Sequence, residues 1–487
     1  MFFNSYIFIL LFLPLVLIGY FGLNSLKKDK LALIYLIGMS LWFCAYQNLT
    51  SLSVLLISIL LNYGIKWLMD KTSETKRKKL FMAAGILINL GILFCFKYYN
   101  FFIENVNAVF KSELPFWQLA LPLGISFYTF MQISFLVDSY REECPKTSFL
   151  EYVAYVSFFP KLIQGPIVRC GEFLPRLQDH AGKKPDFVNL SRGIYAFSLG
   201  LAKKVLLADT LAKIVNIGYN NIEALNSGDA LLVMVCYSLQ IYFDFSGYCD
   251  MAYGIGYALN IRLPINFNSP YKATSISDFW DRWHMTLTKF FTRYLYIPLG
   301  GNRKGTLRTL INIMIVFVVS GMWHGASWTF VLWGALNGIL MVFERVAKVE
   351  NWKLPKLLKQ IVAFTLTTFA WSIFRAPAFG QVVKLWKQLF TGGFGEIYQP
   401  ITDCFNDLLE VKLLIRAGLG TVTEAYPWLI MVVFVAVLVI ACFVMKNTKE
   451  KVEQLKLNTR KLLVVVGLLL WSILSLSEIT EFIYVNF

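Results

Sequence analysis

The chain has 487 residues, of which 57% are hydrophobic and only 16% are charged. Soluble domains contain about 45–50% apolar and about 25% charged residues, so this composition excludes a soluble globular enzyme. Lysine and arginine total 46 against 30 aspartates and glutamates, a net charge of +16. The excess lies in short loops between apolar segments, as in the cytoplasmic loops of membrane proteins, without an aromatic-basic groove pattern. We therefore expect a membrane protein with no nucleic-acid partner.

Apolar blocks of about 20 residues recur along the chain, and each is long enough to cross a bilayer as a helix. The first three are residues 2–23, 31–49 and 52–69. Lysines in the loops 24–30 and 70–79 assign both loops to the cytoplasm and the N-terminus to the outside. The first block lacks a basic start and a small-residue cleavage site, so we expect a retained span rather than a removed signal.

The middle of the chain, from about 115 to 345, differs from these simple hairpins. Gly and Pro interrupt its apolar runs, which also carry ionisable residues such as Asp138 and Lys161. Such side chains are costly at membrane depth and usually face a cavity or a partner. The stretches 155–175 and 277–302 are too broken or too polar for ordinary spans. We expect both to be re-entrant or interfacial segments that build a site.

More ordinary spans resume after residue 357, with a polar insertion at about 391–425 and a last pair of helices around 427–446 and 461–478. The basic loop within this pair assigns the C-terminus to the outside. We predict an all-α polytopic integral membrane protein with roughly 11 transmembrane helices, plus re-entrant or interfacial helices around a central tunnel. The predicted divisions are N-terminal transmembrane hairpins (1–114), a catalytic core (115–345), and C-terminal transmembrane helices with a tyrosine-bearing tail (346–487).

The cysteines and two carboxylates suggest no chemistry of their own. The eight cysteines are scattered, several of them inside apolar stretches, without the spacing of zinc or redox motifs, and we interpret them as small apolar residues. Asp244 and Asp250 are six residues apart, too far for one helical face, so we expect structural polar contacts for them. The two core histidines are 40 residues apart and lack a metal-helix spacing, so we expect no metal.

His324 stands within an otherwise apolar run, in the segment Trp-His-Gly-Ala-Ser-Trp at 323–328. Burying an unpaired polar group costs about 2–7 kcal/mol, so its imidazole needs a partner or a wet cavity. A lone histidine in a helix more often has a structural role, but Gly321 and Gly325 would leave room for a substrate beside this ring. A neutral imidazole can take a proton from a hydroxyl or thiol, which makes His324 a candidate general base.

Aromatic and charged residues alternate around the second core histidine, His284, which follows Arg282 and Trp283. The stretch continues to Asn302 and Arg303. This composition fits an interfacial helix that anchors in the membrane. It also fits an entrance facing the cytoplasm, whose cations bind a phosphate-bearing donor. The residues by themselves leave both interpretations open.

Several segments resemble the membrane-bound O-acyltransferase family, and most closely its bacterial branch of alginate O-acetyltransferase and the related peptidoglycan and cellulose acetylation proteins. The matching motifs are LPLGISFYTF at 121–130, YVSFFP at 155–160, GPI at 165–167, YFDFSGY at 242–248, DMA at 250–252, NFN at 266–268, SISDFW at 275–280, RWH at 282–284, and the segments 294–303 and 321–334.

The resemblance implies acyl transfer from a cytoplasmic thioester donor, through a tunnel, to an acceptor on the far side. It implies that His324 is the catalytic base and that His284 is its companion near the donor. We expect donor or substrate binding by residues around the two histidines: Arg282, Trp283, Asn302, Arg303, Trp323, Ser327 and Trp328.

An aromatic cluster that includes Tyr484 follows the last predicted span. A tyrosine of the interfacial belt is the simpler explanation of this residue. The tail also resembles the C-terminal Phe-Ile-Tyr-x-x-Phe motif of this branch and of the small partner in teichoic-acid D-alanylation, which implies that Tyr484 carries the acyl group. A phenol with a pKa of about 10 needs a base such as His324 to take its proton as it attacks a thioester.

The activity expected from these features is O-acetyl transfer from acetyl-CoA to an exported cell-surface polysaccharide or peptidoglycan. The enzyme would be a multi-pass protein among the lipids of the bacterial inner membrane, without a bound cofactor, and an extracytoplasmic acetyltransferase partner would take the acyl group on. D-alanyl transfer to teichoic acid is the alternative within the family. A transporter or flippase is the alternative outside it, but that class predicts an internal symmetry that the sequence lacks.

Overall fold

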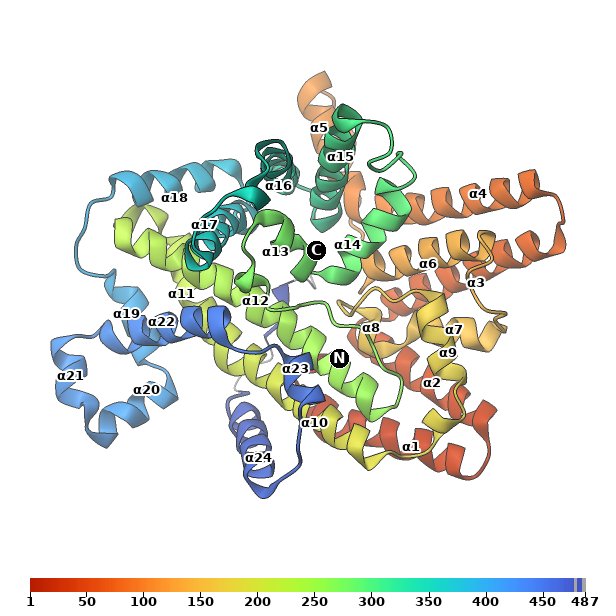
Figure 1. Ribbon diagram of the computed structural model, residues 1–487, viewed down its shortest axis with the longest axis horizontal. Coiled ribbons are helices and arrows are strands. Elements are labelled where there is room, and N and C mark those ends of the chain that lie inside the picture. Colours follow the sequence, from red (N-terminus) through yellow and green to blue (C-terminus); the bar gives the residue numbers. More distant parts are fainter. Residues whose placement is uncertain (477–479, 484–487) are drawn as a thin grey trace.

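In the computed structural model the described residues, 1–476 and 480–483, form helices and loops and no strand. Helix α12 (Ser227–Ala258) crosses the middle of the molecule, and the other helices surround it on all sides (Figure 1). The prediction of an all-α protein is therefore confirmed.

The helices of the N-terminal part are η1 (Phe8–Phe12), α1 (Leu13–Ser25), α2 (Asp29–Gln47), α3 (Leu49–Lys71), α4 (Thr75–Leu93), η2 (Phe94–Tyr98) and α5 (Tyr99–Phe110). The middle part contains α6 (Ile125–Tyr140), α7 (Phe149–Ser157), α8 (Phe159–Leu162), α9 (Cys170–Gln178), η3 (Ala181–Lys183), α10 (Phe187–Ala202), η4 (Lys203–Ala208), α11 (Asp209–Asn220), η5 (Ile222–Ala224), α12, η6 (Pro270–Lys272), α13 (Ile276–Arg282), α14 (Met285–Phe291), η7 (Thr292–Tyr296), α15 (Thr306–His324) and α16 (Trp328–Ala347). The C-terminal part contains η8 (Val349–Asn351), α17 (Lys356–Arg375), α18 (Phe379–Thr391), α19 (Gln399–Asn406), α20 (Leu409–Leu414), η9 (Ile415–Leu419), α21 (Gly420–Ala425), α22 (Leu429–Val444), α23 (Thr448–Glu453) and α24 (Thr459–Leu474).

The chain is a multi-pass membrane protein. Eight helical stretches of the described part are long and apolar enough to cross a bilayer: Phe8–Ser25, Asp29–Gln47, Leu49–Lys71, Thr75–Phe110, Ser227–Ala258, Thr306–His324, Trp328–Ala347 and Lys356–Arg375. The apolar helix α22 is shorter. The continuous helix from α10 through η4 to α11 carries Lys203, Lys204 and Asp209 in its middle, which lowers its hydropathy. Fewer helices qualify than the roughly 11 that the sequence predicts, and the predicted last pair, α22 and α24, has only 16 residues in each helix.

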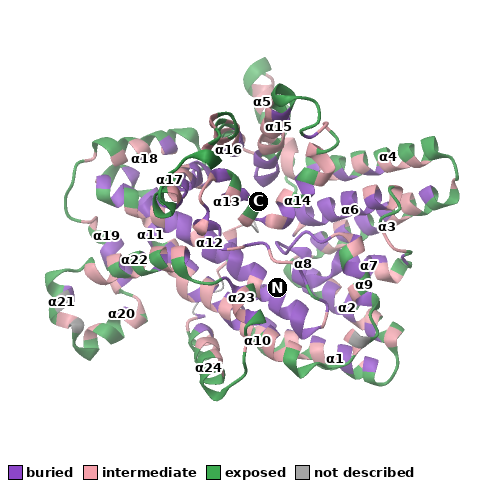
Figure 2. Cartoon of the chain, in the orientation of Figure 1, coloured by how far each residue is buried: buried purple, intermediate pink, exposed green. Residues whose placement is uncertain are grey.

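Burial differs sharply between the central and the peripheral helices. Figure 2 shows α12 almost wholly buried, whereas α4 and α1 expose much of their length. Many of the exposed side chains there are apolar, for example Ile18 and Leu87, each about 70% exposed. In a soluble protein such a surface would aggregate, but in a bilayer it faces lipid. The peripheral helices therefore form the lipid-facing wall around a packed centre.

The two stretches predicted to be broken do not form single spans. Residues 155–175 contain the end of α7, the four-residue helix α8 and the start of α9, and α8 is completely buried. Residues 277–302 are divided among α13, α14 and η7. Pro160 stands in the first turn of α8, where its missing N–H costs no helical bond.

The carboxylates of α12 have the structural roles that their spacing suggests. Asp244 accepts a hydrogen bond from Lys204 at 2.8 Å, and Asp250 accepts one from Lys203 at 2.6 Å. Both lysines begin the π-helical turn η4, which widens the helix locally. The prediction of structural polar contacts for both aspartates is therefore confirmed.

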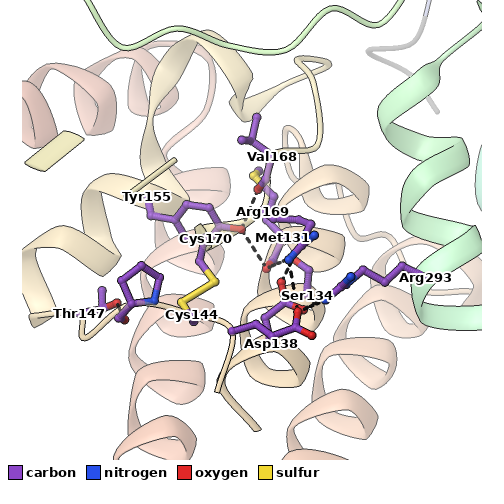
Figure 3. The surroundings of a disulfide bond; sticks show 12 residues. Met131, Ser134, Asp138, Cys144, Thr147, Tyr155, Val168, Arg169, Cys170 and Arg293 are labelled. Carbon is purple, nitrogen blue, oxygen red and sulfur yellow. Dashed lines mark hydrogen bonds and ion pairs between the residues drawn. A yellow bond between two sulfur atoms is a disulfide. The ribbon is translucent and has the colours of Figure 1, made fainter. Parts of the chain in front are cut away.

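One pair of cysteines contradicts the interpretation of all eight as small apolar residues. Cys144 and Cys170 form a disulfide that joins the loop after α6 to the first residue of α9 (Figure 3). Beside it, Arg169 Nε lies 3.0 Å from Asp138 Oδ2, and Arg293 approaches the same carboxylate. The pairing was not predictable from spacing, because the two cysteines are 26 positions apart in a stretch of short helices and loops.

Both described ends of the chain lie inside the molecule. Residues 1–3 are buried, and the first helical stretch begins at Phe8 rather than at residue 2. Asn4 Nδ2 donates a hydrogen bond of 3.0 Å to the carbonyl of Thr480. The ring of Phe482 is buried against Tyr248 of α12. The two ends therefore meet beside the central helix.

Candidate active site

His324 is the last residue of α15, and its side chain is buried. Its ring centroid lies 5.1 Å from that of Trp333 on α16 and 5.3 Å from that of Phe374 on α17. Three spanning helices therefore enclose this imidazole, which excludes bulk water from it.

His284 lies between α13 and α14 and is equally buried. Its backbone has a φ of +45°, in the left-handed region that residues other than glycine seldom adopt. Its carbonyl accepts hydrogen bonds from the amides of Leu287 and Thr288, and these bonds form the first turn of α14. The ring lies 4.8 Å from that of Phe245 on α12. Strained backbone of this kind is concentrated at functional sites.

Trp323 connects the two histidines. Its ring centroid lies 4.9 Å from that of His324 and 6.2 Å from that of His284. On another side it stacks on Phe130 of α6 at 5.2 Å. The fold therefore brings together three of the residues singled out in the sequence, although 40 positions separate the histidines.

The segment that carries His284 is held by groups from three other parts of the chain. The Asn266 carbonyl accepts from the amide of Met285 at 3.0 Å, and Asn266 Oδ1 accepts from Thr286 Oγ1 at 2.7 Å. Thr286 Oγ1 in turn accepts from the amide of Ile167 at 3.0 Å. Glu344 of α16 accepts from the first amides of α13. Three of the matching motifs thus meet beside His284, and Asn266, which the sequence marked only as part of a motif, holds this segment in place.

Several polar atoms near this centre have no hydrogen-bond partner among the described residues. They include both ring nitrogens of His284, Nε1 of Trp323, and both side-chain amide atoms of Gln164. Buried polar groups normally have a partner, so unsatisfied ones mark places where water or a ligand binds. These buried polar atoms are therefore candidate contacts for a polar substrate or for water.

The glycines near His324 serve helix packing rather than substrate access. A side chain at Gly321 would collide with the carbonyl of Phe330 and would lie 3.1 Å from Cα of Gly334. The space beside Gly325 is filled by the ring of Phe330. The expectation that Gly321 and Gly325 leave room for a substrate is therefore wrong, because α15 and α16 cross closely at Gly321 and Gly334.

We expect Gly321→Ala to reduce kcat about 100-fold, because a displacement of about 1 Å at the end of α15 misplaces His324. Acyl-transfer kinetics in detergent measure this effect. Gly91→Ala on α4 is the control, since a Cβ atom there meets no atom within 4 Å. Equal activity of the two variants would contradict a role of this helix crossing in placing the histidine.

Arg282 and Trp283, predicted to bind the donor or substrate, have protein partners. Arg282 Nε lies 2.6 Å from Asp278 Oδ1, four residues earlier on α13. Trp283 is buried, and its ring lies 4.8 Å from that of Trp371 on α17. The Arg282 pair lies within α13, whereas Trp283 packs the end of α13 against α17.

Four other predicted binding residues lie at the ends of helices. Ser327 caps α16, accepting a hydrogen bond from the amide of Thr329. Trp328 is 63% exposed and donates to Asn105 on α5 at 2.9 Å. Asn302 and Arg303 are exposed before α15, whose 19 residues separate them from His324 by about 28 Å. The length of α15 places Asn302 and Arg303 away from His324, whereas Ser327 and Trp328 follow His324 closely in the chain.

The remaining predicted site residue, Tyr484, lies outside the described residues. The chain leading to it is held at the centre of the molecule. Lys204 donates to the carbonyl of Glu481 at 3.0 Å, and the amide of Ile483 donates to Asp244 at 2.9 Å.

Comparisons with known proteins agree with this arrangement. Residues 116–350 match the membrane-bound O-acyltransferase family. The peptidoglycan O-acetyltransferase of Helicobacter pylori is 36% identical over 100% of this chain and 97% of its own length. A probable alginate O-acetylase of Pseudomonas aeruginosa is 35% identical over 81% of this chain and 75% of its own length. The teichoic acid D-alanyltransferase of Bacillus subtilis is 27% identical over 60% of this chain and 80% of its own length. The chain belongs to the membrane-bound O-acyltransferase family and is an O-acyltransferase.

Proposed function

We propose that this enzyme takes an acetyl group from acetyl-CoA in the cytoplasm and delivers it, through a central tunnel, for O-acetylation of an exported glycan. Peptidoglycan is the first candidate acceptor, because the relative named for it aligns along the whole chain. The relatives named for alginate align over about four fifths of it. The observation that carries the proposal is the buried pair of histidines that share Trp323.

In the proposed reaction the hydroxyl of Tyr484 attacks the thioester carbonyl while His324 accepts the phenolic proton. The carbon–sulfur bond breaks, and CoA leaves as a thiolate that takes the proton back from His324. His284 lies near the donor in this proposal and helps to hold the thioester beside His324. The acetyl ester then passes to an acceptor hydroxyl, which restores the tyrosine. Such a relay moves the acyl group across the membrane without moving the donor.

The proposal includes a location and a protein partner. The basic loops favour an orientation in the bacterial inner membrane in which α1 begins and α24 ends on the outer side, and from there the two chain ends fold back into the centre of the molecule. An extracytoplasmic acetyltransferase accepts the acetyl group from the relay and transfers it to the glycan.

Incubation of the purified protein with radiolabelled acetyl-CoA tests the donor and the relay. We expect CoA release and protein-bound label in the wild type, and loss of the label in Tyr484→Phe. Tyr426→Phe is the matched control, because this tyrosine is 54% exposed in the segment just before α22. CoA release with label retained in Tyr484→Phe would remove the relay from the proposal. Absence of CoA release from folded wild type would reject acetyl-CoA as donor.

The acceptor is tested in cells. Base treatment of purified peptidoglycan should release acetate from a strain that carries the gene and none from a strain in which the gene is deleted. Release of D-alanine from teichoic acid, with the same dependence on the gene, would instead establish the alternative within the family. Unchanged ester content in both polymers would direct the search to other exported polysaccharides.

A further inference from the structure

A lysine from the N-terminal hairpins reaches the backbone of the candidate base. Lys97 lies in η2, the π-helical turn that joins α4 to α5. Its Nζ donates to the carbonyl of Trp323 at 2.5 Å and lies 3.4 Å from the carbonyl of His324. A third contact, of 3.2 Å, joins it to Ser126 Oγ on α6. Lys97 thus connects three helices at the point where α15 ends.

The carbonyls that Lys97 contacts would otherwise have no helical partner. The last four carbonyls of an α-helix lack an intrahelical donor, and α15 stops at His324 because Gly325 is extended. Tyr98, the next residue of η2, donates to the carbonyl of Met322 at 2.9 Å. A cation near the C-terminus of a helix also interacts favourably with the helix dipole. Two consecutive side chains of η2 therefore cap the turn that carries the histidine.

The π-helical turn explains how the lysine can point there. A π-bulge inserts an extra residue into a helix and redirects the side chains at that point, and such bulges are frequent at functional sites. No carboxylate among the described residues lies within ion-pair distance of Lys97. A partly buried ammonium without a carboxylate is costly, so the carbonyls at the end of α15 provide its main compensation.

We propose that Lys97 is a positioning residue for the reaction, whose ammonium holds the last turn of α15 and thereby fixes the place of the His324 ring. The inference rests on the proposed role of His324 as the base. It extends the active site to the N-terminal hairpins, since Lys97 lies outside the residues 116–350 that match the family. Because the carbonyls at the end of α15 hold the Lys97 ammonium, we expect loss of the ammonium to affect the chemical step rather than donor binding.

The test compares Lys97→Met, which removes the charge and the donor, with Lys97→Arg, which keeps both. We expect kcat of the Met variant to fall at least about tenfold with KM within about twofold of wild type, and the Arg variant to recover most of the loss. Lys76→Met, at an exposed lysine of α4, is the matched control and should behave as wild type. Wild-type kcat in Lys97→Met would overturn the proposal. Equal losses in the Met and Arg variants, with KM raised in both, would also overturn it.

A second measurement does not depend on acyl transfer. Amide hydrogen exchange should become faster in the last turn of α15, residues 320–324, in Lys97→Met, and remain unchanged in α16. If the wild type releases no CoA, the proposed function fails, and this exchange experiment decides the inference about Lys97 by itself. Unchanged exchange in residues 320–324 would show that the lysine does not hold this turn.

Discussion

Replacing His324 by alanine should reduce acyl transfer about a thousandfold, which lies within the range of about 10²–10⁴ that a general acid–base group contributes. The residue is buried at the end of α15, and its ring contacts the rings of Trp323, Trp333 and Phe374. No other imidazole except His284 lies in this centre, because the third histidine, His180, is exposed. The measurement is kcat/KM for CoA release by purified protein.

Two further variants make this result specific. His180→Ala removes an imidazole that is 85% exposed and should leave the kinetics unchanged. His324→Gln fills most of the space of the ring, so it separates loss of the base from loss of packing. Activity of His324→Gln within about tenfold of wild type would reject His324 as the base, since such a loss is below what general-base catalysis contributes.

Replacing Lys204 by methionine should lower the free energy of unfolding by about 3–5 kcal/mol, the cost of breaking a buried ion pair by removing one partner. Lys204 Nζ lies 2.8 Å from Asp244 Oδ1 and 2.9 Å from Asp209 Oδ1, and its side chain is 2% exposed. Without the ammonium, the buried carboxylate of Asp244 and the partly buried carboxylate of Asp209 lose their shared cation. The unfolding midpoint in detergent measures the loss.

The same substitution should release the C-terminal tail. Lys204 donates to the carbonyl of Glu481, and Asp209 accepts from Thr480 Oγ1 at 2.7 Å. We therefore expect carboxypeptidase to remove Phe482 faster from Lys204→Met than from wild type, as followed by intact mass.

The neighbouring lysine provides the control for both effects. Lys203, in the same turn of η4, pairs with Asp250, but its side chain is 20% exposed and it has no hydrogen bond to the described residues of the tail. Lys203→Met should therefore destabilise the protein less and leave the tail protected. Equal losses of unfolding free energy in Lys203→Met and Lys204→Met would show that burial does not determine how much the Lys204 ion pair stabilises the protein.

The composition and local patterns of the sequence predicted the spanning helices, the two broken segments and the buried histidines. Apolar blocks of bilayer length predict spanning helices, because the backbone must satisfy its hydrogen bonds within each segment in lipid. Proline, glycine and charge mark residues 155–175 and 277–302 as broken, and both are divided into short helices. The two buried histidines could be identified because an imidazole in an apolar run requires an explanation. The catalytic roles of His324, His284 and Tyr484 stay predictions.

The sequence by itself determined the class of protein, the approximate positions of the spans and the candidate residues, because these depend on composition and on spacing along one helix. Only the tertiary structure decided which distant segments meet: the two histidines at Trp323, Cys144 with Cys170, and Lys97 with the end of α15. It also showed that Gly321 serves a helix crossing rather than a substrate. These contacts arise from packing between helices far apart in the chain, and the periodicity of a single helix contains no information about its partner.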